Sequence, residues 1–286
     1  MGEIISRQDD VCFSYVDAGS GPPLLFSHAN GFPASVYSPI FHMMKNDFHT
    51  MGLNFCGTSG CRVDCLEGPR KIKNWISLVD NIIRFIELIV GEPVVAAGHS
   101  MSGTIIAMAS VMRPDLFKKI ILLDPVFLYP RIMNDMRFLA LSRQRHRMPL
   151  AVGARRRRDN WTSRKEAREY FSDKPLFKCW DERMFDSYIE DGLVETPDGV
   201  ELAFPKGLEA FLFGSVPTSM WKYIKQMKKE ALVVRGEESD VLTDDTWELL
   251  KHTRPDVEYL ELSGLGHLFP MQAPEMTAEM IVDFAS

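Results

Sequence analysis

A serine at the junction of an apolar run and a helical run most constrains how this chain folds. Residues 93–97 are almost continuously apolar, as in a buried strand, and residues 103–109 are the small and apolar residues of a packed helix. Between them, residues 98–102 read GHSMS and differ from the G-x-S-x-G pattern only at the last position. Small residues let the strand and the helix approach closely at such a turn. The pattern therefore predicts that Ser100 presents its hydroxyl there, as a nucleophile does.

Apolar segments alternate with helical patterns along most of the chain. Strands are predicted at residues 11–17, 23–27, 50–54, 94–97, 119–123, 231–235 and 257–262, and helices at 36–44, 74–88, 102–112, 244–251 and 274–284. Continuously apolar strands separated by helices are typical of a parallel sheet that is covered on both faces. We therefore predict an α/β fold with an open, doubly wound, mostly parallel sheet.

The alternation stops for about a hundred residues after Asp124, a length that is too great for a structureless loop. This stretch is rich in Arg, Met, Phe and Trp and has the pattern of several helices. We predict a core domain made of residues 1–126 and 228–286, and a helical cap, or lid, made of residues 127–227.

Size and charge limit the classes of function. A chain of 286 residues with 45% hydrophobic content can bury a large core, and a net charge of −6 argues against general affinity for nucleic acid or anionic membranes. No apolar stretch approaches the roughly 20 residues that cross a bilayer, and the N-terminus is too polar for a secretory signal. We expect a cytoplasmic protein without membrane insertion.

The five cysteines are Cys12, Cys56, Cys61, Cys65 and Cys179, and three of them fall within ten residues. A structural zinc site needs paired cysteines or histidines at ligand spacing, and no second pair or nearby histidine follows. We expect free thiols, no metal and no cofactor.

Polar residues follow four of the predicted strands. They lie at residues 28–33, at Ser100, at residues 236–240 and at residues 264–267. Ligands of open α/β sheets collect at the carboxyl ends of the strands. The order of these segments along nearly the whole chain resembles the α/β-hydrolase superfamily, and more narrowly its capped, cytoplasmic, esterase-like serine hydrolases.

The resemblance implies a catalytic triad in the chain order Ser100, Asp240 and His267. A serine hydroxyl is a poor nucleophile unless a neutral imidazole takes its proton, and His267 is the candidate base. Asp240 would accept the other imidazole proton. The resemblance favours Asp240, because residues 235–242 look like the acid loop of the superfamily. Asp124, which follows the strand at 119–123, is the alternative acid, although an aspartate there more often caps or packs.

The resemblance also implies an oxyanion hole built from the backbone amides of Met101 and Asn30. The chain has His28-Ala29 where similar families commonly have His-Gly, so the assignment to Asn30 requires that Ala29 adopt the needed conformation. We expect His28 to orient this loop and His99 to pack under the serine turn.

Two features of the cap have alternative interpretations. The run 155–158, four arginines, is expected to be a solvated or acid-neutralised face near Glu166, with one arginine toward the cleft as the alternative. Aromatic and methionine side chains either line an apolar pocket or form the cap's own core, and these are Trp161, Phe171, Phe177, Trp180, Phe204, Phe211, Phe213, Met220 and Trp221.

The function that these features predict is hydrolysis of carboxylic esters of small to medium apolar substrates through an acyl-enzyme. The alternatives are a carbon–carbon bond hydrolase or a lactonase with the same triad, or a ligand-sensing protein with slow turnover. The expected partner is a small-molecule ester. The sequence does not fix the oligomeric state, and a homodimer stays open.

Overall fold

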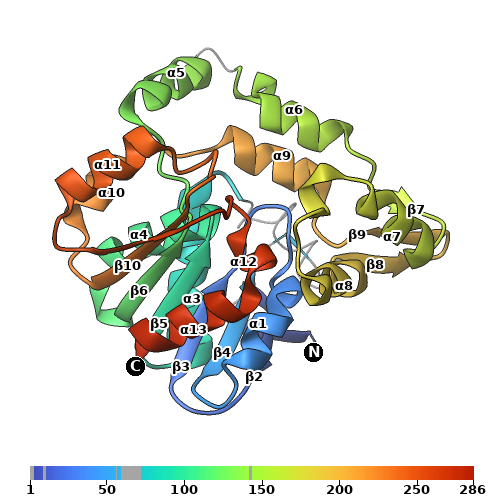
Figure 1. The fold of residues 1–286 in the computed structure, drawn as a ribbon, viewed down its shortest axis with the longest axis horizontal. Coiled ribbons are helices and arrows are strands. Elements are labelled where there is room, and N and C mark those ends of the chain that lie inside the picture. The colour runs from blue at the N-terminus through green and yellow to red at the C-terminus, as the bar shows by residue number, and fades with distance from the viewer. Residues whose placement is uncertain (1–2, 9–10, 56, 59–71, 142–143) are drawn as a thin grey trace.

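The computed structural model describes residues 3–8, 11–55, 57–58, 72–141 and 144–286. Within these residues an eight-stranded sheet runs in the order β1-β2-β4-β3-β5-β6-β10-β11 (Figure 1). Its strands are β1 (Ile4–Gln8), β2 (Val11–Ala18), β3 (Pro23–Ser27), β4 (His49–Asn54), β5 (Val94–His99), β6 (Phe117–Leu123), β10 (Glu230–Gly236) and β11 (Glu258–Leu262).

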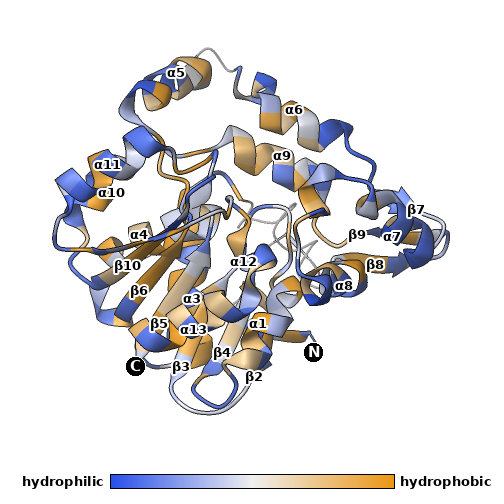
Figure 2. Ribbon diagram, in the orientation of Figure 1, coloured by the Kyte–Doolittle hydropathy of each residue, from blue (hydrophilic) through white to orange (hydrophobic). Residues whose placement is uncertain are grey.

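The sheet is mostly parallel, which confirms the predicted fold class. All neighbours from β4 to β11 pair in parallel, whereas β1 with β2 and β2 with β4 pair antiparallel. Every residue of β3 and β5 is buried, as expected for central strands covered on both faces. Figure 2 shows the same strands as hydrophobic ribbons and the outer helices as mixed or hydrophilic.

Helices cover the sheet on both faces. They are α1 (Ser38–Met43), α3 (Trp75–Phe85), α4 (Met101–Met112), α11 (Asp244–Thr253), α12 (Phe269–Gln272) and α13 (Pro274–Ala285). The first and last of these, α1 and α13, pack together on one face, and α3 and α4 pack together on the other. Each predicted core helix overlaps an observed one, and the sheet is doubly wound as expected.

The long segment between β6 and β10 contains a small sheet as well as helices. Its elements are α5 (Pro130–Leu141), α6 (Pro149–Arg156), β7 (Asn160–Trp161), α7 (Arg164–Ser172), α8 (Glu182–Asp191), β8 (Leu193–Thr196), β9 (Gly199–Leu202), α9 (Lys206–Gly214) and α10 (Met220–Gln226). The three strands form an antiparallel sheet in the order β7-β9-β8, which the all-helical expectation missed. We call the segment from α5 to α10 the insert. Its status as a separate cap domain stays a prediction.

Four of the eight predicted aromatic residues of the insert are buried and pack against one another. Three of these rings contact Tyr188 directly, with centroid distances of 4.9 to 5.8 Å, and they belong to Phe171, Phe177 and Trp180. The fourth, Trp161, contacts Phe171. Edge-to-face and tilted ring pairs of this kind add stability beyond burial. The core interpretation therefore holds for these four residues.

The cysteines only partly follow the expectation. Cys12 is disulfide-bonded, so the expectation of a free thiol is wrong there, whereas Cys179 is free and exposed. Cys56, Cys61 and Cys65 lie outside the described residues. Disulfides persist mainly in oxidising compartments, so the bond at Cys12 does not support the expected cytoplasmic location. That location stays a prediction. No described helix is both long and apolar enough to span a bilayer.

Candidate active site

Ser100 lies directly after β5 and directly before α4, on strained backbone. Its φ of 59° and ψ of −120° fall where residues other than glycine are rarely found. Two backbone bonds hold this conformation: Ser100 N–H donates to Leu123 O at 2.8 Å, and Gly103 N–H donates to Ser100 O at 3.1 Å. The hydroxyl makes no capping bond to α4, so it remains available for chemistry.

The small residues around Ser100 are required by close backbone approaches. A Cβ atom on Gly98 would lie 2.7 Å from the backbone of Ser102, and one on Gly103 would lie 2.9 Å from Pro125. Ser102 replaces the usual last glycine, and its buried hydroxyl donates a hydrogen bond to the carbonyl of His28. The serine that departs from the G-x-S-x-G pattern thus connects α4 to the loop after β3 through this hydrogen bond.

His267 contacts Ser100, as the sequence predicted. Its Nε2 atom lies 2.9 Å from Ser100 Oγ, although the two residues are 167 positions apart. His267 follows β11 and precedes α12, and Gly264 makes its loop turn with a φ of +71°. The imidazole keeps 17% of its side-chain exposure, so one edge of it remains reachable from outside.

The acid beside His267 is Asp124, and the expectation of Asp240 is wrong for this structure. His267 Nδ1 lies 2.8 Å from Asp124 Oδ1. The Asp124 carboxylate is fully buried, whereas Asp240 is exposed. Ser239, which precedes Asp240, instead donates its hydroxyl to Asp124 Oδ1 at 2.6 Å. The loop after β10 therefore orients the acid without supplying it.

The order of the strands explains this choice. Asp124 follows β6 immediately, and β6 lies between β5 and β10 in the sheet. The backbone at Asp124 has a φ of 43°, and its N–H donates to Val234 O of β10 at 2.7 Å. Gly236 N–H donates to Asp124 Oδ2 at 3.0 Å. Both carboxylate oxygens are thus bonded, with Oδ1 directed at His267.

A buried hydrogen-bonded chain connects the loop after β3 to the backbone of His267. Ala29 N–H donates to Tyr37 Oη at 3.1 Å, and that hydroxyl lies 2.7 Å from His99 Nδ1. His99 Nε2 lies 2.9 Å from His267 O. A carbonyl can only accept, so His99 donates from Nε2 and accepts the Tyr37 hydroxyl at Nδ1. Burial lowers the pKa of His99 to about 3, which keeps it neutral.

His28 orients the loop after β3, as expected. Its Nδ1 donates to Ala29 O at 2.8 Å, and its Nε2 accepts from Phe55 N–H at 3.1 Å. Burial lowers the pKa of His28 to about 4, against the opposing effect of its bond to Ala29. Ala29 is not among the described residues with positive φ, whereas Gly31 has a φ of +92°. Alanine at this position therefore needs no glycine conformation.

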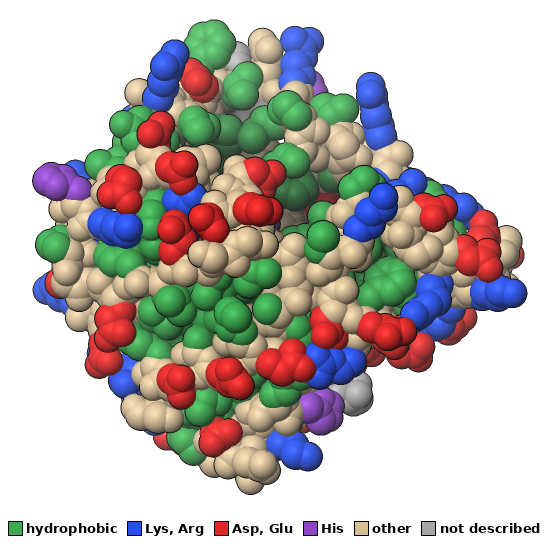
Figure 3. All heavy atoms as spheres, in the orientation of Figure 1, with side chains coloured by type: hydrophobic (Ala, Val, Ile, Leu, Met, Phe, Trp, Pro, Cys, Tyr) green, Lys and Arg blue, Asp and Glu red, His purple; other side chains and the backbone are tan. Residues whose placement is uncertain are grey.

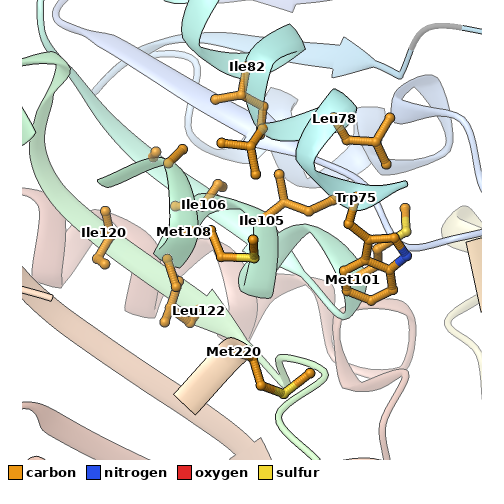
Figure 4. Packing of buried hydrophobic residues seen from close by; sticks show 14 of the residues in the cluster. Trp75, Leu78, Ile82, Met101, Ile105, Ile106, Met108, Ile120, Leu122 and Met220 are labelled. Carbon is orange, nitrogen blue, oxygen red and sulfur yellow. The ribbon is translucent and has the colours of Figure 1, made fainter. Parts of the chain in front are cut away.

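Met101 and Asn30 flank the serine turn. Met101 begins α4, where the first N–H groups of a helix have no partner within it. The side chain of Met101 is buried in the cluster that also holds Trp75 and Ile105 (Figure 4). Met101 can therefore contribute to the site only through its backbone N–H. Asn30 Nδ2 donates to the backbone oxygen of Glu209 at 3.1 Å. Their roles as oxyanion donors stay predictions.

The insert packs directly against this region. Phe204 lies edge-on to His28 with a centroid distance of 5.9 Å, and Trp75 Nε1 donates to Leu212 O of α9 at 3.0 Å. The face in Figure 3 is hollowed near α9, with hydrophobic side chains around the hollow. Of the remaining predicted pocket residues, Met220 is fully buried and Phe211 is exposed.

The arginine run is mostly structural, as expected. Arg158 forms an ion pair with Glu166 at 2.6 Å and lies over the Trp161 ring, and Arg155 donates to His146 O at 2.8 Å. Arg157 differs, because it reaches inward to Glu209 of α9 at 2.9 Å. Sequence reasoning did not single out Glu209, and a lone glutamate within the apolar run 208–214 was the available signal.

Comparison with known proteins gives concordant matches. The model of the alpha/beta hydrolase family matches residues 24–280. The chain is 27% identical over 217 residues to the uncharacterized hydrolase YugF of Bacillus subtilis, covering 74% of this chain and 72% of that protein. It is 28% identical over 113 residues to the (E)-2-((N-methylformamido)methylene)succinate hydrolase of Acinetobacter baylyi, covering 40% and 41%. The crystal structure of E-2-(acetamidomethylene)succinate hydrolase matches with a TM-score of 0.78 at 18% identity, over 99% of both chains, which shows a shared fold.

Proposed function

Because this chain belongs to the alpha/beta hydrolase family, we propose that it is a serine hydrolase that cleaves carboxylic esters through an acyl-enzyme. The observation that carries the proposal is the continuous contact from Ser100 Oγ through His267 to Asp124, with distances of 2.9 and 2.8 Å. A hydroxyl, an imidazole and a buried carboxylate in this order are the parts of a proton relay.

In the first step Ser100 Oγ attacks the ester carbonyl carbon, and His267 Nε2 takes the hydroxyl proton. Asp124 accepts a hydrogen bond from Nδ1–H of His267, which selects the tautomer whose Nε2 is free to act as base. The same carboxylate stabilises the imidazolium that forms. The tetrahedral intermediate collapses when His267 gives its proton to the leaving alcohol, and the acyl group remains on Ser100.

The negative charge on the carbonyl oxygen of the intermediate requires donors that are already in position. We assign this role to the backbone amides of Met101 and Asn30, because one opens α4 and the other lies in the loop that His28 and Tyr37 hold. Losing one such donor typically raises the barrier by about 3 kcal/mol.

Water completes the cycle. His267 takes a proton from a water molecule whose oxygen attacks the acyl carbon, and it then returns that proton to Ser100 as the acid leaves. No cofactor enters any step of this proposal. The observed 17% exposure of the His267 side chain is compatible with water reaching it.

Amide hydrolysis is the second candidate for the bond that is cleaved. It is favoured by the similarity to the hydrolase of Acinetobacter baylyi, whose name states a formamido-bearing succinate as its substrate. The same attack on a carbonyl serves both bonds, and they differ in the leaving group that His267 must protonate.

The test is covalent labelling together with turnover. We expect a fluorophosphonate probe to modify Ser100, as located by mass spectrometry, and a Ser100→Ala variant to lose both labelling and hydrolysis of p-nitrophenyl esters and anilides. The ratio of ester to anilide turnover in the unsubstituted protein decides between the two bonds. Labelling at another residue, or unchanged turnover in the purified variant, would reject the proposal.

A further inference from the structure

Arg157 and Glu209 form a partly buried ion pair that contacts the loop after β3. Arg157 directly follows α6, and Glu209 lies in the first turn of α9. Arg157 Nη2 lies 2.9 Å from Glu209 Oε2, and Nη1 donates to Oε1 at 3.2 Å. The Glu209 side chain is only 9% exposed, and that of Arg157 is 29% exposed. A charged pair is seldom kept in such a place for stability alone, because desolvation offsets much of its attraction.

The pair touches the loop that carries the predicted oxyanion donor. Asn30 Nδ2 donates to the backbone oxygen of Glu209, at 3.1 Å. Gly31 follows Asn30, and a Cβ atom at Gly31 would lie 2.8 Å from Glu209 Oε1. The carboxylate therefore lies against the loop after β3 that contains Asn30.

Within the described residues, Nε and Nη2 of the Arg157 guanidinium make no hydrogen bond, although Nη2 is ion-paired with Glu209. The end that carries Nη1 and Nη2 faces Glu209, whereas Nε and Nη2 are buried and lack an aligned hydrogen-bond acceptor. Nε and Nη2 present two parallel N–H groups along the other edge of the guanidinium. This fork matches the two oxygens of a carboxylate, and buried donors are otherwise nearly always satisfied.

We propose that Arg157 determines specificity by binding a carboxylate on the acyl part of the substrate, with Glu209 holding its guanidinium against the oxyanion loop. This inference rests on the proposed function, and it replaces an apolar acyl chain by one that ends in a carboxylate. Arg157 binds the ground state and the transition state alike, so it is a specificity-determining residue outside the proton relay.

The charge of the pair is compatible with an anion. Burial raises the pKa of Glu209 to about 7, although Arg157 acts to lower it. At neutral pH the Glu209 carboxyl is therefore partly protonated, and the pair retains net positive charge in a chain whose formal charge is −6. Tyr188, which faces both groups, is neutral because burial raises its pKa. A carboxylate would thus meet an uncompensated fraction of the Arg157 charge.

The first experiment measures binding without turnover, in a Ser100→Ala background, by titration calorimetry. The probes are monomethyl glutarate, which carries one carboxylate, and dimethyl glutarate, which carries none. We expect Arg157→Gln to weaken binding of the monomethyl ester by at least about 10-fold, which is the size of one charged hydrogen-bonded contact. Arg156→Gln, on the exposed neighbour of Arg157, is the matched control and should leave this affinity within about 2-fold.

The second experiment measures selectivity in the active protein. We expect Arg157→Gln to lower kcat/KM for mono-p-nitrophenyl glutarate at least about 10-fold more than for p-nitrophenyl hexanoate, mostly through KM. Arg157→Lys keeps the charge but loses the fork, so its loss of selectivity should lie between the unsubstituted protein and the glutamine variant. If the glutamine variant does not fold, the lysine variant takes its place in the test. Equal losses on both esters, or unchanged affinity for monomethyl glutarate, would overturn the inference. Absent turnover of both esters would count against the proposed function, and the binding result would still decide the role of Arg157.

Discussion

Two residues of the candidate site are held on strained backbone. Ser100 and Asp124 are the described residues other than glycine with positive φ, at 59° and 43°. Each such conformation costs about 1 to 3 kcal/mol and persists only where the surroundings enforce it. The enforcing bonds come from neighbouring strands, since Ser100 N–H donates to Leu123 O and Asp124 N–H donates to Val234 O. The sheet therefore sets the directions in which these two side chains point.

We predict that Asp124→Asn lowers kcat for ester hydrolysis by about 10⁴-fold, the effect of holding the histidine in the wrong tautomer. An asparagine amide in this place would donate to His267 Nδ1 or leave it unpartnered. The imidazole proton would then lie on Nε2, which could no longer accept the proton of the Ser100 hydroxyl. Steady-state kinetics with a p-nitrophenyl ester measure the loss.

Asp240→Asn is the matched control, because Asp240 is exposed and follows the next strand of the sheet. Its kcat should stay within about 2-fold of the unsubstituted protein, as for a surface substitution. A large loss in this variant together with an active Asp124→Asn variant would show that the loop after β10 moves to supply the acid.

The choice between these two acids illustrates what local sequence can determine. The serine turn is encoded locally, by an apolar strand, small residues and a helix, and Ser100 could be predicted from it. Asp124 and Asp240 both follow apolar strands, so local pattern treats them alike. They differ in the order of β5, β6 and β10 across the sheet, which depends on contacts between distant segments.

At the scale of elements, the site depends on the hydrogen-bonded chain from Ala29 through Tyr37 and His99 to His267. It joins the loop after β3, the short helix η1 (Ala34–Tyr37), β5 and the loop after β11. Each of its polar groups is buried, so each requires its partner. The chain thus couples the position of the loop after β3 to the position of His267.

We predict that Tyr37→Phe destabilises the protein by about 1 to 3 kcal/mol, because it leaves Ala29 N–H and His99 Nδ1 buried without partners. It should also lower kcat, since His267 and the loop after β3 lose the side chain that connects them. Urea denaturation and ester kinetics measure the two effects.

Tyr259→Phe is the control for loss of a tyrosine hydroxyl. Tyr259 donates to backbone oxygens of Leu250 and Arg254, on the far side of β10 from β5. It should reduce stability without reducing kcat. A Tyr37→Phe variant that shows the same pattern would restrict the hydrogen-bonded chain to a purely structural role.

Some elements could not be predicted, and the physical reasons differ. β1 pairs with β2 at the edge of the sheet, and its sequence IISRQ has too few apolar residues to form a strand pattern. The small sheet of the insert uses β8 and β9, of four residues each, with mixed polar and apolar positions. Short strands of this kind are stabilised by their pairing partners, which no local window contains.

At the scale of the whole molecule, the insert and the sheet share their buried clusters. Phe204, Leu208 and Leu212 of the insert belong to the cluster of α3 and α4, and Trp161 and Tyr188 belong to the cluster of α1 and α13. Because the two parts share these clusters, unfolding of either part removes buried contacts from the other. Buried titratable groups in either part therefore affect the stability of the entire chain.

Three such groups give opposite dependences on pH. The pKa values of His28 and His99 are lowered by burial to about 4 and about 3, so their contribution to stability is present above pH 6.5 and is lost as pH falls. The pKa of Glu209 is raised by burial from 4.5 to about 7. Its contribution is present below pH 4.5 and is lost as pH rises through 7.

We therefore predict that Glu209→Gln changes the shape of the stability profile. Because the histidines are common to both proteins, the difference in their free energies of unfolding isolates Glu209. From about pH 5 to about pH 8, the unsubstituted protein should lose stability relative to the glutamine variant, by up to about 3 kcal/mol. Urea denaturation of both proteins across this range measures the difference. Parallel profiles would mean that the Glu209 carboxyl titrates near its ordinary pKa, and that Arg157 is fully neutralised at pH 7 by an ionised partner.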